Sequence, residues 1–227
     1  MRRAGHKFGT LLVIVGLGTI TWVGVTWVWE DPFTSLWQRF QQRELADRYE
    51  RQADLFRPGI LVSGGEAPDF RQAARRYRRS LEEGDPVGRL RVRRLGIDMV
   101  VVEGTATEPL KRGPGRYERS FVPGERELVY VAGHRTTYGA PFSRIDRLRP
   151  GDSVFFELPY GTFEYRITRH VIVRATDVGV LRSRHREVVA LQACEPRFFA
   201  SHRYIAYAEP VAVTVDGTRY DYTPTSR

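Results

Sequence analysis

Residues 159–168 read PYGTFEYRIT. Three apolar side chains, Phe163, Tyr165 and Ile167, alternate with polar ones, and the turn-forming residues 159–161 stand directly before them. Successive side chains of a β-strand point to opposite faces, so this alternation is typical of a strand with one buried face. The stretch therefore predicts a β-strand that follows a tight turn.

Similar short runs of β-branched and aromatic residues lie on both sides of this stretch, and turn residues bound each of them. About eight such strands, with little helix between them, predict a mainly β domain that is closed or nearly closed into a barrel. We assign this domain to residues 85–220. The other predicted strands cover residues 90–92, 99–102, 128–132, 154–158, 171–173, 188–193 and 204–215.

The composition limits the possible classes of protein. The chain has 227 residues, of which 41% are hydrophobic, enough for one medium domain with an appendage. Cys194 is the single cysteine, which excludes a disulfide scaffold and a cysteine-rich zinc site. The formal net charge is +9, and all of the 36 basic residues except Lys7 and Lys111 are arginines. Basicity alone identifies no partner, because genome composition produces such a bias as easily as binding chemistry does.

The amino-terminal region contains an uncharged stretch, LLVIVGLGTITWVGVTWVW at residues 11–29. At about 1.5 Å per residue, a helix of that length covers the hydrocarbon core of a bilayer. No small-residue cleavage site follows it, so a retained transmembrane helix is favoured over a cleaved signal peptide. Equal numbers of basic residues flank the stretch on its two sides, but acidic residues are present only on the C-terminal side. This difference favours a cytoplasmic tail at residues 1–10.

Residues 30–84 are predicted to form a juxtamembrane helix and a linker. Apolar residues near helical spacing within residues 34–56, among charges of both signs, indicate an amphipathic helix. We interpret it as a spacer between the membrane and the domain. Prolines and glycines at residues 58–68 predict a flexible linker. The apolar positions of the helix are Trp37, Phe40, Leu45 and Tyr49.

A block of arginines runs from Arg71 to Arg94. Nucleic-acid binding would require aromatic platforms or a reading motif nearby, and Tyr77 is the one aromatic residue of the block. We therefore expect no nucleic-acid partner, and we interpret the block as a surface that faces solvent or lipid headgroups. Residues 221–227 are assigned to a C-terminal tail.

Reactive side chains stand where three of the predicted strands begin or end. His134 and Cys194 each follow an apolar strand, and Arg203 begins the last one. A free thiol has a pKa of about 8.5, so only a few per cent of it is thiolate at neutral pH. His134 can accept or donate a proton during acyl transfer, and the cationic Arg203 can favour the thiolate or hold an oxyanion. These three residues form a candidate catalytic set.

Each member of this set also has a plainer interpretation. A lone cysteine is more often a small buried hydrophobe. His202 competes with His134 as the base, but it should point to the opposite face of the strand from its neighbour Arg203. Glu195 would raise the pKa of the thiol if it faced the sulfur, so we expect it to point away.

The ordered segments resemble those of the sortases, membrane-anchored cysteine transpeptidases of Gram-positive bacteria, over roughly residues 90–215. The run GHRTTYGAPF at residues 133–142 closely resembles the histidine motif of the class E group of actinobacteria. Residues 191–203 are similar to the cysteine-to-arginine signature of the family. The remaining similar segments are RLGIDMVVVEG at 94–104, GPGRY at 113–117 and LRPGD at 148–152.

This resemblance implies an eight-stranded sortase-type β-barrel with short helices, and it implies roles for individual residues. Cys194 would be the nucleophile, His134 the general acid and base, and Arg203 the residue that positions the substrate carbonyl. Tyr138 and Thr137, beside His134, are candidate substrate-binding residues. Ala193 is a third candidate, and it departs from the threonine that many sortases carry before the cysteine.

The resemblance also implies a reaction. The enzyme would cleave an LAXTG-like or LPXTG-like sorting signal of a secreted protein between threonine and glycine, through a thioacyl intermediate. It would then transfer the protein to a peptidoglycan precursor amine or a pilin lysine, with no metal or cofactor. The catalytic domain would lie outside the cell membrane, with the N-terminus in the cytoplasm.

Two other functions fit parts of the pattern. An L,D-transpeptidase is also a cell-wall enzyme with cysteine and histidine, but the expected Ser-His-Gly-Cys signature is missing around Cys194. A non-catalytic membrane-tethered barrel would bind a wall polymer or lipid headgroups through its arginines.

Overall fold

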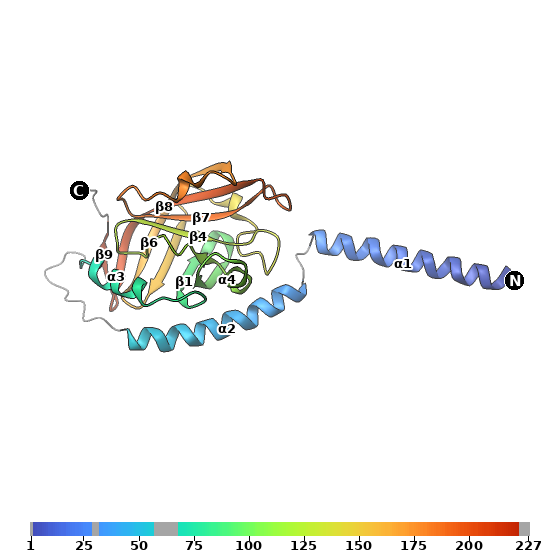
Figure 1. Ribbon diagram of the computed structural model, residues 1–227, viewed down its shortest axis with the longest axis horizontal. Helices are drawn as coiled ribbons and strands as arrows, with labels where there is room; N and C mark the ends of the chain where they lie inside the picture. The colour runs from blue at the N-terminus through green and yellow to red at the C-terminus, as the bar shows by residue number, and fades with distance from the viewer. Residues whose placement is uncertain (1, 29–31, 57–67, 223–227) are drawn as a thin grey trace.

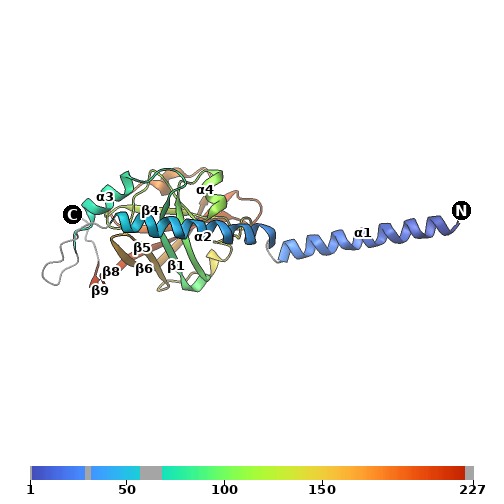
Figure 2. The same cartoon turned by 90° about the horizontal axis from the view of Figure 1, so that it is seen from below.

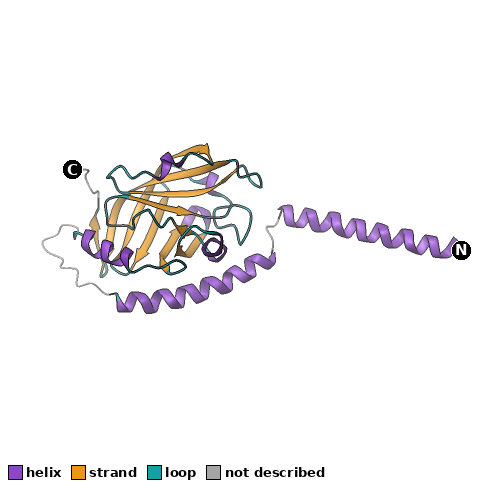
Figure 3. Ribbon diagram, in the orientation of Figure 1, coloured by secondary structure: helices purple, strands orange, loops and turns teal. Residues whose placement is uncertain are grey.

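The computed structural model describes the backbone of residues 2–28, 32–56 and 68–222, and the side chains of residues 9–22, 24, 37–56 and 68–222. Its centre is a single sheet with the strand order β6-β5-β1-β2-β3-β4-β7-β8-β9, and additional pairing of β6 with β8 closes the first eight strands into a barrel. The predicted eight-stranded barrel is therefore confirmed, and the short helices lie at its periphery (Figure 3). The strands are β1 (Pro86–Val92), β2 (Ile97–Glu103), β3 (Gly115–Arg116), β4 (Leu128–Ala132), β5 (Ser153–Leu158), β6 (Gly161–Arg174), β7 (Val188–Glu195), β8 (His202–Val215) and β9 (Thr218–Asp221).

The helices comprise two long ones and several short ones. The α-helices are α1 (Arg2–Val28), α2 (Pro32–Leu55), α3 (Arg71–Arg79) and α4 (Thr107–Arg112), and the 3-10 helices are η1 (Arg93–Leu95), η2 (Ile145–Arg147) and η3 (Val178–Leu181).

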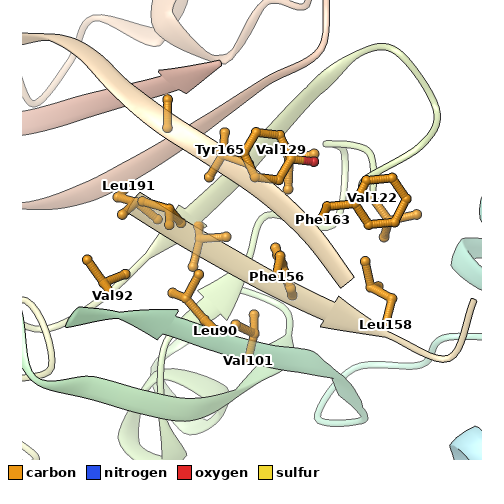
Figure 4. Packing of buried hydrophobic residues seen from close by; sticks show 14 of the residues in the cluster. Leu90, Val92, Val101, Val122, Val129, Phe156, Leu158, Phe163, Tyr165 and Leu191 are labelled. Atoms are coloured by element: carbon orange, nitrogen blue, oxygen red, sulfur yellow. The ribbon is translucent and has the colours of Figure 1, made fainter. Parts of the chain in front are cut away.

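The alternation in residues 163–168 takes the expected form in β6. Phe163, Tyr165 and Ile167 are buried in the barrel interior, where they join apolar side chains of β1, β2 and β5 (Figure 4). The strand is longer than predicted, because the separate run at 171–173 continues it to Arg174. Two strands were missed: β3 has only two residues, and β9 lies partly in the predicted tail.

Helix α2 lies along the barrel, where it crosses β1 and β2 (Figures 1 and 2). Leu45 and Tyr49 are buried against Val100 and Val102 of β2. The Gln42 amide clamps the same strand, since it donates to the Val100 carbonyl at 3.0 Å and accepts from the Val100 amide at 2.7 Å. The helix is therefore packed on the barrel as part of the folded domain, and its role as a spacer next to a membrane stays a prediction.

The arginine block does not form one continuous surface. Residues 71–79 are helix α3, in which Ala74 and Tyr77 point into the barrel core. Arg75 and Arg79 are exposed as expected, whereas Arg78 forms a 2.7 Å ion pair with the nearly buried Glu125. The aromatic residue of the block is thus a core side chain, and its hydroxyl donates to the Val87 carbonyl at 2.9 Å.

The start of β7 is held by a buried carboxylate. Glu187 is 1% exposed and accepts hydrogen bonds from the hydroxyls of Tyr165 and Tyr222, at 2.7 and 2.9 Å. The backbone amides of Gly124 and Arg126 donate to it as well. Burial raises the pKa of Glu187 even though these four donors favour the charged form. The network fixes the residue that leads directly into β7.

Helix α1 extends away from the barrel (Figure 1), and its apolar side chains, such as Leu11 and Ile20, are exposed. None of the helices in the described residues combines the length and the hydropathy that a membrane span requires. Part of the predicted span at residues 11–29 lies outside the described residues, and the span stays a prediction.

The packing of α2 predicts different effects for two large apolar residues on the same helix. Leu45→Ala removes a side chain that is 0% exposed, so we expect the free energy of unfolding to fall by about 2–4 kcal/mol. Phe40→Ala is the control, because Phe40 is 66% exposed and its removal should change stability by less than about 0.5 kcal/mol. Urea denaturation of both variants measures the difference. Equal stabilities would contradict the docking of α2.

Candidate active site

The parallel pairing of β4 with β7 brings two of the predicted site residues together. Ala132 is the in-register partner of Gln192, and the Gly133 amide donates to the Gln192 carbonyl at 2.9 Å. His134 and Cys194 each follow this pair by two residues. Because the strands run in the same direction, both residues emerge at the same edge of the barrel.

Strand β8 brings the third residue to the same place. Arg203 is the in-register partner of Cys194 across the antiparallel β7–β8 pair, and directly opposed side chains lie on one face. That face is the outer one, since Ile205 and Tyr207, which alternate with core residues of β8, belong to a cluster outside the barrel interior. The thiol and the guanidinium therefore project from the same side of the sheet.

The Arg203 guanidinium is fixed by the loop between β7 and β8. Its Nη1 donates to the Ala200 carbonyl at 2.7 Å and to the His202 carbonyl at 2.9 Å. Among the described residues the guanidinium makes no other hydrogen bond, so its Nε and Nη2 donors are free for a ligand. A positioned guanidinium with unused donors can stabilise negative charge on an oxygen.

His134 is held in a half-buried position. The Phe142 amide donates to its carbonyl at 3.0 Å, and the ring packs 5.2 Å from that of Tyr138. Its Nε2 is buried and has no hydrogen-bond partner among the described residues. Burial lowers the pKa of His134 below the usual value of 6.5. The imidazole is therefore mainly neutral at pH 7 and can accept a proton.

The three predicted substrate-binding residues lie in different environments. Tyr138 is half-buried beside His134, and the Lys111 ammonium lies 6.0 Å from its ring centroid. Thr137 is exposed in the same loop. Ala193 is 0% exposed and belongs to the barrel core, so neither its side chain nor its backbone is open to solvent.

Glu195 and His202 are paired in register on β7 and β8, one position away from Cys194 and Arg203. Neighbouring residues on a strand point to opposite faces, so both side chains lie on the other face from the thiol, as expected. The Glu195 carboxylate forms an ion pair with Arg135. The His202 ring is 2.9 Å from the hydroxyl of Ser201.

Arg135 is a site residue that the sequence analysis missed. It is 6% exposed, and its Nη1 donates both to the Glu195 carboxylate and to the Cys194 carbonyl, the latter at 3.1 Å. Its Nη2 lies 3.3 Å from Asp146. This side chain ties the histidine loop to the end of the cysteine strand. The one signal in the sequence was its position directly after His134.

A cavity of about 170 Å³ lies beside Arg203 on the outer face of the barrel. Strand residues form its floor, and residues 175–181 of the segment between β6 and β7 form its wall. The sequence analysis did not identify these residues, because apolar side chains in a loop carry no periodic signal. The floor residues include Tyr130, Ala132 and Gln192.

Comparison with known proteins gives a consistent result. The family model described as "Sortase domain" matches residues 90–211. Sortase D of Bacillus subtilis (strain 168) is 33% identical over 134 residues, which cover 57% of this chain and 66% of that protein. The chain spans about half of the length of two Streptomyces coelicolor relatives, 42% and 54%.

Solved structures extend the similarity to three dimensions. Sortase E from Streptomyces avermitilis superimposes with a TM-score of 0.53 at 34% identity, covering 59% of this chain and 93% of that one. A Clostridium perfringens Sortase D5 transpeptidase gives a TM-score of 0.61 at 20% identity, covering 75% and 98%. The second similarity concerns the fold alone.

The burial of His134 predicts the direction of its titration. Its pKa should lie below 6.5, because burial disfavours the charged imidazolium. NMR titration of the imidazole Cε1 proton measures this value, and the signal is assigned by its loss in His134→Gln. The imidazole signal of the exposed His185 should still be present in the spectrum of that variant. A midpoint for His134 at or above 6.5 would contradict the buried geometry.

Proposed function

Because the chain belongs to the sortase family, we propose that it is a cysteine transpeptidase that cleaves a sorting signal and transfers the acyl part to an amine. The observation that carries this proposal is the register of three strands. Cys194 lies between its in-register partner Arg203 and the strand end that leads to His134. A nucleophile, a base and an oxyanion donor are the groups that acyl transfer requires.

In the proposed first half-reaction, His134 accepts the proton of the Cys194 thiol. The sulfur then attacks the carbonyl carbon of the threonine in the signal, and the free donors of Arg203 hold the oxygen on which negative charge develops. The tetrahedral intermediate collapses as His134 returns its proton to the departing glycine amine. A thioester between Cys194 and the threonine remains.

The second half-reaction reverses these proton transfers. An acceptor amine attacks the thioester carbonyl while His134 removes a proton from the amine. The thiolate of Cys194 leaves and is protonated, so that one peptide bond is broken, another is formed and the enzyme is regenerated. The acceptor amine would belong to a peptidoglycan precursor or a pilin lysine.

For the signal we propose an LAXTG-like or LPXTG-like pentapeptide at the C-terminal end of a secreted protein. Similarity of the loop at residues 133–142 to the class E motif supports the first form. The cavity of about 170 Å³ beside Arg203 offers space for side chains that precede the threonine. Tyr138 and Thr137, in the loop that carries His134, are the proposed further contacts.

We also propose that residues 11–29 anchor the enzyme in the cell membrane with the catalytic domain outside. The uncharged sequence and the exposed apolar side chains of α1 support this arrangement. Clients and acceptors of the proposed reaction lie outside the membrane, which supports the same orientation.

The catalytic proposal is tested by removing the nucleophile and the base. In Cys194→Ala and His134→Ala, turnover of a fluorogenic LAXTG or LPXTG peptide should fall at least about a thousandfold, because neither can complete the acyl transfer. Mass spectrometry of the wild type without an acceptor amine should detect the thioacyl adduct on Cys194.

The matched control is His202→Ala, since its ring lies on the opposite face of β8 from Arg203. This variant should keep most of the activity. Retained turnover in Cys194→Ala would refute the mechanism. Lack of any turnover and of any thiol reactivity in the wild type would favour the non-catalytic barrel instead.

The orientation is tested with a reporter. Alkaline phosphatase fused after Arg227 should be active in cells. This reporter needs its own disulfide bonds for activity, and they form only outside the cytoplasm. The same reporter fused after Thr10 should be inactive. The reverse pattern would contradict both the orientation and the proposed access to clients.

A further inference from the structure

A second and larger cavity, of about 720 Å³, adjoins the one beside Arg203. The two cavities share Asp177 and Val180. The strand residues Val171, Val173 and Val188 supply apolar side chains to the lining of the larger one, and we call this part its floor. Four arginines line it, Arg169, Arg182, Arg184 and Arg186, and we call it the arginine groove.

Most charged side chains around the arginine groove are already held by a contact with another group. Arg186 forms a 2.5 Å ion pair with Glu209, and the Arg169 guanidinium lies 4.1 Å from the ring centroid of Tyr207. The Asp177 carboxylate accepts from the Gly179 amide at 3.0 Å.

Arg182 and Arg184 are different. Both side chains are exposed, and neither guanidinium makes a hydrogen bond or ion pair with any residue that the structure describes. The groove therefore carries unpaired positive charge above an apolar floor, where a ligand with negative and apolar groups fits best.

The distance between the groove and the nucleophile suggests which part of a substrate reaches it. At about 3.3 Å per residue, β7 extends about 20 Å from Val188, in the groove, to Cys194. Four extended residues of a signal, ending at the threonine attached to Cys194, cover only about 13 Å. The residues directly before the signal would then lie opposite the first residues of β7.

We propose that the arginine groove binds acidic side chains in the segment of the client protein immediately N-terminal to the sorting signal. This inference rests on the proposed function. Arg182 and Arg184 would pair with the carboxylates, and the valines of the floor would contact the aliphatic parts of the same segment. A peptide is favoured over a phosphate-rich polymer because the floor is apolar and continuous with the proposed signal site.

The experiment compares three peptides with one LAXTG core: one preceded by three glutamates, one preceded by three serines, and one with the three glutamates after the glycine. We call the three residues before the core the leader. In the wild type, KM for the peptide with the glutamate (acidic) leader should be about fivefold lower than KM for the peptide with the serine leader, which is the gain typical of two exposed ion pairs. The value of kcat should not change, because the reacting atoms are the same. At about 1 M salt, where the Debye length is about 3 Å, the difference should disappear.

Variants assign the effect to the arginine groove. Arg182→Ala combined with Arg184→Ala should abolish the preference for the acidic leader while leaving turnover of the serine-leader peptide unchanged. The matched control is Arg75→Ala combined with Arg79→Ala, which removes the same charge from α3, outside the groove. Fluorescence anisotropy with Cys194→Ala measures binding of the three peptides without turnover. The peptide with the acidic leader should bind more tightly than the peptide with the serine leader.

The outcomes separate this inference from the proposed function. Equal KM values for the acidic and serine leaders would overturn the inference and leave the transpeptidase intact. A stronger effect of glutamates after the glycine would overturn the assigned segment. Binding of phosphatidylglycerol vesicles through Arg182 and Arg184, without competition by the acidic peptide, would make the groove a lipid site and also overturn it. Failure to cleave any peptide would refute the proposed function, and the inference with it.

Discussion

The parallel pairing of β4 with β7 is the constraint on which the site depends. Parallel neighbours cannot be joined by a tight turn and need a long crossover. Here the crossover contains β5 and β6, and these strands complete the barrel through the pairing of β6 with β8. The crossover from β4 to β7 therefore has two effects. It separates His134 and Cys194 in the sequence, and it returns the chain so that both residues lie at one edge of the barrel.

The charged side chains near the thiol of Cys194 hold the end of β7 in place. Arg135 is almost fully buried and forms ion pairs with Glu195 and Asp146, so the acidic residue beside Cys194 is neutralised on the face opposite to the thiol. Arg135 also donates a hydrogen bond to the Cys194 carbonyl. The ion pair of Arg135 with Glu195 therefore helps to fix the backbone at Cys194. The Arg135 side chain is buried, so removing its partner Glu195 would leave a charge with reduced access to water, which is costly. This tie therefore favours one arrangement of the histidine loop and the end of β7.

The sequence predicted those features that a periodic or ordered pattern carries. Alternation located β6, and strand ends identified His134, Cys194 and Arg203, which the structure brings to one edge of the barrel. The sequence does not show which apolar residues of a helix pack against the rest of the protein. Leu45 is buried, whereas Phe40 on the same helix is exposed. The two-residue strand β3 is too short to show a period. Arg135 was missed because arginines are rarely buried, and only tertiary contacts reveal its partners.

The net charge of +9 divides into groups with different physical roles. Arg116 is 1% exposed and is consumed by its ion pair with Glu103, so it adds nothing to the external field. Exposed arginines on α3 contribute only screened charge, which decays within about 10 Å at ordinary ionic strength. Arg182 and Arg184 differ because they line a cavity that adjoins the one beside Arg203, so their field acts next to the proposed signal site. The proposed selection of a client segment therefore depends on where an arginine lies relative to the candidate site, rather than on the total charge.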